Sequence, residues 1–194
     1  MKRDAAPARL DVIDFASTAA TLAGEEPVSG FPRVAAELAG AAETAPSAPG
    51  ATGAPDAPSV RWTATGARRA GASGAVEPWL HLQADAVVPL ICQRCLAPVD
   101  TALQVDRWFR FAPDEATAAV EDELADEDVL VAARDFALRE LIEDELLMEI
   151  PFTPRHDVCP QPVRLTASDE AFDEGEGERA NPFAVLGSLR PRKS

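Results

Sequence analysis

Three stretches of the chain alternate apolar and polar residues with a period of two, and this pattern constrains the fold more than any other feature. The stretches are Val60–Ala64, Leu80–Leu90 and Val99–Val105. Side chains alternate between the two faces of a strand, so each stretch predicts a strand with one buried face, as in an antiparallel sheet. The alternation inverts at Arg107 and Trp108, which predicts either a bulge or a sheet edge.

Helical patterns precede and follow these strands. Within residues 9–42, Asp14 is expected to cap a helix over Phe15–Ala23, and Pro32 is expected in the first turn of a helix over Phe31–Leu38. Farther along, apolar residues at helical spacing begin after Asp135 and end at Pro151. The carboxylates of this last helix are expected to form a solvated face; they are Glu140, Glu143, Asp144, Glu145 and Glu149.

The sequence therefore predicts an α+β fold. We expect a small antiparallel sheet, one long helix in the C-terminal half, N-terminal helices and a largely irregular acidic tail. Residues 1–40 are expected to pack on the core as a helical segment, and the Ala/Pro-rich residues 41–58 are expected to be a linker or insert. The main domain is then 59–160, and 161–194 is an extended tail.

The net charge of −15 is concentrated in two blocks. Residues 114–128 contain eight acids and no base, and residues 169–178 contain six acids and no base. Without these fourteen acids, the chain has 19 acids against 18 bases and is nearly neutral. Such blocks are expected to be solvated loops, since packing them would bury uncompensated charge. The alternative is that they attract a basic partner, such as a ribosomal protein.

The pair Cys92 and Cys95 is the strongest chemical signal. Two cysteines three residues apart in a turn form half of a tetrahedral zinc site, and His156 and Cys159 offer a second half. The two halves lie about sixty residues apart, so only the tertiary fold can bring them together. Free buried thiols and a redox pair are the alternatives. The redox hypothesis is the weakest, because this pair lies between predicted strands and not at a helix N-terminus.

Other chemistry has little support in the sequence. No phosphate-binding loop, nucleophile elbow or HExxH motif is present, so we expect no catalysis and no small-molecule substrate. Arg107, Trp108 and Arg110 interleave bases and an aromatic residue as RNA contact requires, although an edge strand with extended arginines explains them too. A short basic tip is the other candidate contact; it consists of Arg190, Arg192 and Lys193.

The chain contains no apolar run of the roughly 20 residues that span a bilayer, and no apolar stretch follows residues 1–7 as in a signal peptide. Three unevenly spaced cysteines do not make a secreted disulfide framework. We therefore expect a cytoplasmic protein without a membrane partner.

Three segments together resemble the bacterial YceD family, the large ribosomal RNA subunit accumulation proteins. They are Leu90–Cys95, then Leu141–Pro151 followed by His156 and Asp157, and finally Asn181–Leu189. Their order and spacing are similar to those of the family across most of residues 60–190. None of them is a catalytic signature.

The resemblance implies a non-enzymatic factor that supports the synthesis, processing or stability of 23S ribosomal RNA. Its partner would be the large-subunit precursor, engaged through RNA or through a basic ribosomal protein. Some relatives carry extra cysteines after the helix, which favours an ancestral metal site. This chain has only Cys159 there, a departure that puts zinc binding in doubt. The insert at 41–58 is longer than in close relatives, and we expect it to be dispensable.

Overall fold

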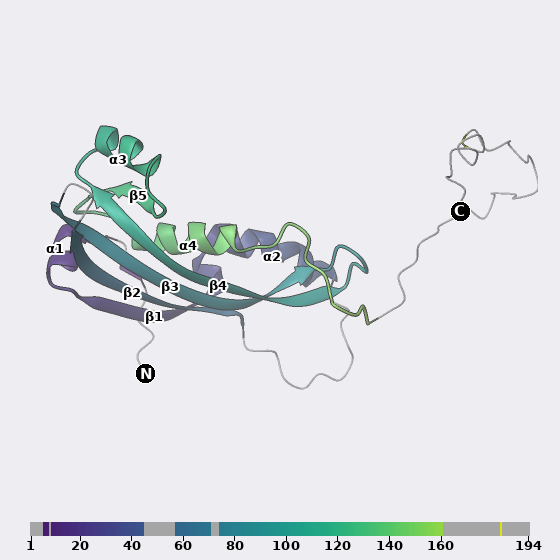
Figure 1. Cartoon of the computed structure of the whole chain (residues 1–194). Helices are drawn as coiled ribbons and strands as arrows, with labels where there is room; N and C mark the ends of the chain where they lie inside the picture. The colour runs from purple at the N-terminus through teal and green to yellow at the C-terminus, as the bar shows by residue number, and fades with distance from the viewer. Residues whose placement is uncertain (1–5, 8, 45–56, 71–73, 161–182, 184–194) are drawn as a thin grey trace, which may run out of the picture. The chain divides into compact units, whose positions relative to one another are not determined.

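The computed structural model describes residues 6–7, 9–44, 57–70, 74–160 and 183, and it contains a five-stranded sheet whose spatial order follows the chain, β1-β2-β3-β4-β5 (Figure 1). The strands are β1 (Thr21–Pro27), β2 (Ser59–Ala70), β3 (Val76–Ile91), β4 (Pro98–Ala112) and β5 (Asp128–Val131). The helices are α1 (Val12–Ser17), the 3₁₀ turn η1 (Val28–Gly30), α2 (Pro32–Thr44), α3 (Glu115–Asp122) and α4 (Leu138–Met148). None of the described helices is long and apolar enough to cross a membrane.

The α+β prediction is confirmed. Neighbouring strands from β1 to β4 are antiparallel, and only β5 runs parallel to its neighbour β4. All three predicted strands are present as β2, β3 and β4, and each extends beyond both ends of the alternating stretch that predicted it. The boundaries predicted at residues 40, 58 and 160 stay predictions, because residues 45–56 and most of the chain after 160 lie outside the described part.

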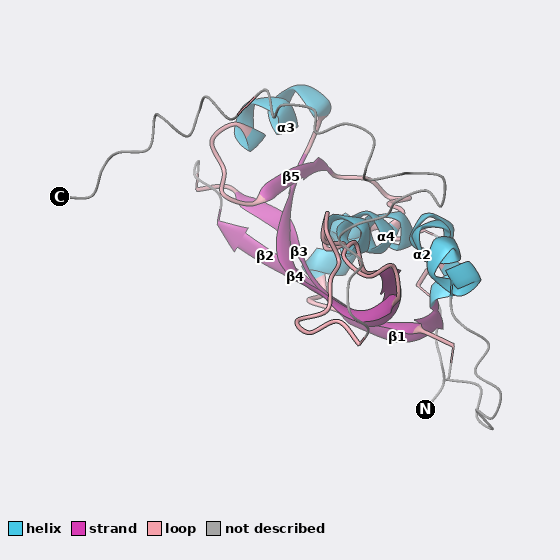
Figure 2. Ribbon diagram, turned by 90° about the vertical axis from the view of Figure 1, so that its right-hand side faces the viewer, coloured by secondary structure: helices cyan, strands magenta, loops and turns pink. Residues whose placement is uncertain are grey.

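Helices α1, α2 and α4 cover one face of the sheet, which we call the inner face. Their apolar side chains join alternate residues of β2, β3 and β4 in one core. In two views at right angles, α2 and α4 lie side by side over this face (Figures 1 and 2). Gly66 of β2 allows α1 to approach, since a Cβ at this position would stand only 2.4 Å from the carbonyl oxygen of Phe15.

The helix predicted over Phe15–Ala23 is wrong. The helix in this region is α1, which Asp11 caps through the backbone N–H groups of Ile13 and Asp14. The chain then turns, and Thr21–Pro27 becomes the edge strand β1 against β2. Pairing with an existing strand satisfies the backbone of this segment and overrides its helical composition. The helix predicted over Phe31–Leu38 is confirmed as α2.

The acidic block at 114–128 is not a loop, although none of its eight acids is buried. It forms α3 and the start of β5, and Ala118 of α3 packs with Ala112 and Val129 in a small second cluster. Five of its eight carboxylates accept hydrogen bonds or pair with arginines. They are Asp114, Glu121, Asp122, Glu127 and Asp128. Two arginines and two backbone N–H groups thus engage five of the acids, and the block keeps a net negative charge.

The inversion at Arg107 and Trp108 is not a bulge. The pairing of β3 with β4 runs without interruption from Trp79↔Arg110 to Ile91↔Pro98. Arg107 keeps its place on the inner face, where its guanidinium pairs with Glu145 and Asp128 at 3.0 and 2.7 Å. An ion pair thus takes the position that an apolar side chain would occupy in a regular alternation.

The solvated face predicted for the last helix is only partly correct. The helix itself begins at Leu138 and not at Asp135, because residue 136 bridges to Leu10 first. Glu143 and Glu145 are 5% and 3% exposed. Arginines from other elements explain this burial, since a carboxylate can leave water when a guanidinium meets it.

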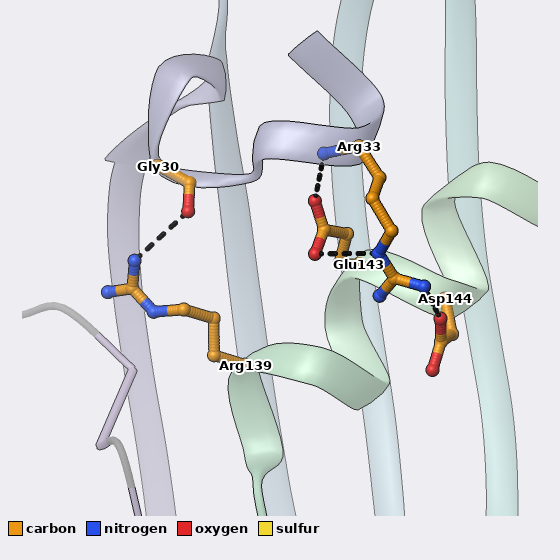
Figure 3. A network of polar contacts seen from close by, with 5 residues as sticks. All are labelled: Gly30, Arg33, Arg139, Glu143 and Asp144. Atoms are coloured by element: carbon orange, nitrogen blue, oxygen red, sulfur yellow. Dashed lines mark hydrogen bonds and ion pairs between the residues drawn. The ribbon is translucent and has the colours of Figure 1, made fainter. Parts of the chain in front are cut away.

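A polar network joins α4 to the start of α2 (Figure 3). Glu143 accepts the backbone N–H of Arg33 at 2.6 Å and its side-chain Nε at 3.1 Å. Arg33 also reaches Asp144, and Arg139 donates to the carbonyl oxygen of Gly30. Arg139 pairs in addition with Glu26, another buried carboxylate. This network fixes α2 and α4 against each other above the sheet.

Candidate metal centre

The turn between β3 and β4 holds the first half of the site. Cys92 follows directly after β3, and its backbone N–H donates to the carbonyl oxygen of Ala97 at 2.9 Å. The N–H of Leu96 donates back to the carbonyl oxygen of Cys92 at 2.8 Å. Leu96 closes the turn with φ at 59°, a left-handed conformation that side chains other than glycine rarely adopt. This tight turn places the sulfurs of Cys92 and Cys95 on the same side.

The segment after α4 supplies the second half. The N–H of Gln93 donates to the carbonyl oxygen of Pro154 at 2.8 Å, which fixes this segment against the turn. The Nδ1 atom of His156 then lies 3.4 Å from the sulfur of Cys95. The ligand atoms of Cys92, Cys95, His156 and Cys159 all lie within 4.8 Å of one another. The fold thus brings together the two halves that the sequence holds sixty-one residues apart.

Backbone amides shape the charge of the cluster. Burial of the Cys92 sulfur raises the pKa of this thiol, but the backbone N–H groups of Cys95, His156 and Arg94 outweigh burial and hold the pKa at about 5. The N–H of Ala97 lowers the pKa of Cys95, whereas burial and the neighbouring sulfurs raise it above its ordinary value. Amides directed at a sulfur favour its thiolate form, which is the form that binds metal.

Arg94 connects the two halves directly. Its Nε lies 3.1 Å from the sulfur of Cys159, and its Nη2 donates to the carbonyl oxygens of His156 and Asp157 at 2.9 and 3.2 Å. The hydrogen bond to the sulfur of Cys159 raises the pKa of Arg94. Three thiolates around a divalent ion would carry one net negative charge, and this guanidinium would balance it.

The arrangement fits a tetrahedral ion. Zinc–sulfur bonds of about 2.3 Å place two thiolates roughly 3.8 Å apart, so a small contraction from the present limit of 4.8 Å suffices. Four protein ligands fill a tetrahedron and leave no position for a substrate. The Cys₃His group can therefore hold a metal ion as a closed site.

The predicted contact residues fall into different environments. Arg107 lies in the ion pairs described above, and Arg110 is 7% exposed and pairs with Glu77, Glu121 and Glu127. Trp108 is half-buried on the other side of the sheet. The remaining predicted contacts, Arg190, Arg192 and Lys193, lie outside the described residues.

Sequence reasoning missed three residues that the structure places in these regions. Arg94 was assigned no role, although a base between the two cysteines of a CxxC pair can balance the charge of their thiolates. Arg69 and His81 stack against Trp108, at 3.5 Å for the guanidinium carbon and 4.3 Å for the imidazole centroid. Only the strand register, which the sequence does not specify, brings Arg69, His81 and Trp108 together.

Fold and site together define an α+β protein with a Cys₃His cluster that can hold a metal ion, and comparison with known proteins gives its family. Residues 80–190, more than half of the chain, match the family described as large ribosomal RNA subunit accumulation protein YceD, and the chain belongs to this family. The protein of that name from Haemophilus influenzae is 30% identical over 115 residues, which cover 54% of this chain and 61% of the relative. The chain thus spans less than two thirds of that relative's length. No solved structure matches the chain.

Proposed function

We propose that this protein supports the accumulation of large-subunit ribosomal RNA by binding and not by catalysis. Membership of the YceD family carries this proposal, together with the relative named for the same role. In this role it would act in the cytoplasm on the large-subunit precursor and support synthesis, processing or stability of 23S ribosomal RNA. A binding role agrees with the described carboxylates of the core, which are paired with arginines and not held free for proton transfer.

The cluster of Cys92, Cys95, His156 and Cys159 is proposed to hold zinc as a structural ion. Support comes from the close approach of the four ligand atoms and from the amides directed at Cys92. The ion would tie the β3–β4 turn to the segment after α4 and supply no reactive position. Zinc would therefore stabilise the fold around the β3–β4 turn and would not take part in catalysis.

A thiol-redox function is the second candidate, and the low pKa of Cys92 favours it. The location of the pair argues against it, because the CxxC turn lies between two strands and shares its sulfurs with a third cysteine and a histidine. Substituting both Cys92 and Cys95 with serine separates the candidates only if zinc content is measured as well.

The first experiment is depletion of the protein followed by measurement of large- and small-subunit ribosomal RNA. A selective fall in the large-subunit RNA supports the proposal, and an unchanged ratio contradicts it. Copurification before and after nuclease treatment identifies the route. A ribosomal protein retained after nuclease indicates protein-mediated binding, whereas loss of the complex indicates RNA.

Metal analysis of protein purified without chelator tests the zinc site. We expect one zinc per chain, with loss of the metal in Cys95→Ser and retention in Asp157→Asn, a neighbour that contributes only its carbonyl oxygen. A stoichiometry near zero in the wild-type protein contradicts the metal proposal. If the zinc content is near zero and depletion phenotypes still require both thiols, the redox function takes precedence.

A further inference from the structure

The outer face of the sheet, opposite to α2 and α4, carries a three-layer stack of side chains. The rings of His81 and Trp108 are parallel within 6°, with centroids 4.3 Å apart. The guanidinium carbon of Arg69 lies 3.5 Å from the Trp108 ring centroid and 5.0 Å from that of Trp79. Trp79 meets Trp108 edge-on at 6.4 Å. The stack thus joins side chains of β2, β3 and β4, and its end at Arg69 is an exposed planar cation.

The charges around this stack leave Arg69 free for a ligand. Asp85 pairs with Arg61, and Asp106 accepts from His81 and Gln83 at 2.6 and 3.0 Å, so these two carboxylates already have partners. Within the described residues, no ion pair is found for Arg69, whose guanidinium lies over the two indole rings and which is opposite Glu77 in the register of β2 with β3. Arg110 on the same face is already shared by Glu77, Glu121 and Glu127, so Arg69 is the cation of the stack that can turn to a new partner.

A polar groove adjoins the stack along the same face. Its volume is about 490 Å³, and its walls include the hydroxyl of Thr63 and the amides of Gln83 and Gln104. The charged residues that line it are Arg61, Asp85 and Asp106, whose carboxylates are engaged as described above. Asp106 links the groove to the stack, because its carboxylate accepts hydrogen bonds from both Gln83 and His81. Amides and hydroxyls are the groups that donate to and accept from the edges of nucleobases.

Resting on the proposed function, we infer that this outer face binds single-stranded RNA, with one base stacked on Trp108 and Arg69 moved onto a phosphate. A cation over a partly exposed ring is held more weakly than a stacked base, so the base displaces the guanidinium, which then gains a phosphate partner. One free arginine beside a flat ring suits a single strand, whereas duplex binding relies on many phosphate contacts. The groove of Gln83 and Gln104 then lies next to the neighbouring base.

The full-length protein is titrated into a fluorescein-labelled 12-nucleotide oligouridine, and binding is followed by fluorescence anisotropy. Trp108→Leu should weaken binding about tenfold or more, while Trp108→Phe retains a stacking ring and most of the affinity. Arg69→Gln should weaken binding and reduce the slope of log affinity against log salt by about 0.7. Arg134→Gln is the matched control, because Arg134 is an exposed arginine outside this face.

Two further probes make the test specific. An abasic sugar–phosphate oligomer of equal length should bind equally well to wild type and Trp108→Leu, since it offers charge but no base. The chain has three tryptophans and no tyrosine, and Trp62 is 2% exposed, so quenching of intrinsic fluorescence on RNA addition reports on Trp79 and Trp108. Trp108→Phe should lose most of this quenching while still binding the labelled RNA.

The inference is overturned if Trp108→Leu binds oligouridine as well as wild type does, or if Arg69→Gln behaves as Arg134→Gln does. It is also overturned if oligouridine does not bind while an arginine-rich peptide binds in a manner that requires Trp108, since the face is then a protein surface. If RNA binding fails but depletion still lowers large-subunit RNA, the proposed function stands without this site. If the RNA ratio is unchanged on depletion while oligouridine binds, the proposed function fails and the site stands.

Discussion

Removal of one buried carboxylate, Glu143, should destabilise the joint between α2 and α4. Its side chain is 6% exposed and accepts two hydrogen bonds, one of them from the backbone N–H of Arg33 (Figure 3). Arg33 is the second residue of α2, and the residue before the helix is Phe31, which has no side-chain oxygen to cap it. Glu143 therefore acts as the cap of α2 from another helix.

The magnitude follows from these contacts. A hydrogen bond to a charged group contributes about 1.5–3 kcal/mol, and a carboxylate at a helix N-terminus adds about 0.3–1 kcal/mol. We expect Glu143→Ala to lower the free energy of unfolding by about 2–4 kcal/mol. Its neighbour Asp144 contacts the same Arg33, but both side chains are about half exposed, so Asp144→Ala should cost about 1 kcal/mol or less.

Urea unfolding followed by circular dichroism measures both variants under the same conditions. Arg33→Gln separates the two bonds of Glu143, because it removes the side-chain partner and keeps the backbone N–H. In the Arg33→Gln background, Glu143→Ala should still cost more than half of its original effect. If Glu143→Ala costs no more than Asp144→Ala, or if its effect vanishes in the Arg33→Gln background, the carboxylate does not cap α2 and the reasoning is refuted.

The remaining predictions concern the sheet and the turn. Gly66→Ala should lower the free energy of unfolding by about 1–3 kcal/mol in urea, because the new methyl group meets a backbone carbonyl of α1 that cannot move aside; Gly74→Ala, where nothing lies within 4 Å, should cost less despite its φ of +78°. Leu96→Gly should leave stability unchanged or raise it by up to about 1 kcal/mol, since glycine adopts the left-handed φ without strain and the Leu96 side chain is exposed. A loss of stability greater than about 1 kcal/mol in the same assay would contradict the idea that Leu96 is strained. His81, and next Gln83, lower the pKa of Asp106 by hydrogen bonding, so the stability that Asp106 contributes is present above its ordinary pKa and is lost as pH falls through the lowered one. The stability difference between wild type and Asp106→Asn should therefore shrink on acidification in urea titrations from pH 6 to pH 2, and a difference that grows would reverse the sign of this argument.

The sequence predicted the strands well because their cause is local. Burial of one face imposes a period of two on β2, β3 and β4, and this period is visible in the sequence as alternating apolar and polar residues. Strand β1 has no such pattern, since Thr21–Pro27 lies at the edge and owes its conformation to pairing with β2. A helical composition next to a good cap was therefore misread as a longer helix.

The charged residues were the harder part. An acid on a helix is expected to face solvent unless an arginine from another element is known to lie against it. The partner of Glu145 is Arg107 on β4, thirty-eight residues earlier in the chain. The ligand set of Cys92, Cys95, His156 and Cys159 was recognisable from residue types and spacing, although their convergence depends on the fold. The stack of Arg69, His81 and Trp108 was not recognisable, because its members come from three strands in a register that no local signal encodes.

The bridge between the β3–β4 turn and the segment after α4 also has a consequence for chain entropy. A metal-ligand link between Cys95 and His156 closes a loop of about sixty residues, and a cross-link of that span lowers the entropy of the unfolded chain by an amount worth about 4 kcal/mol at 25 °C. The closed loop contains β4, α3, β5 and α4, whereas β1 and β2 lie outside it. Release of the proposed ion should accordingly speed amide hydrogen exchange in β5 and α4 before it affects β1 and β2, and the ion would then set the cooperativity of one half of the domain.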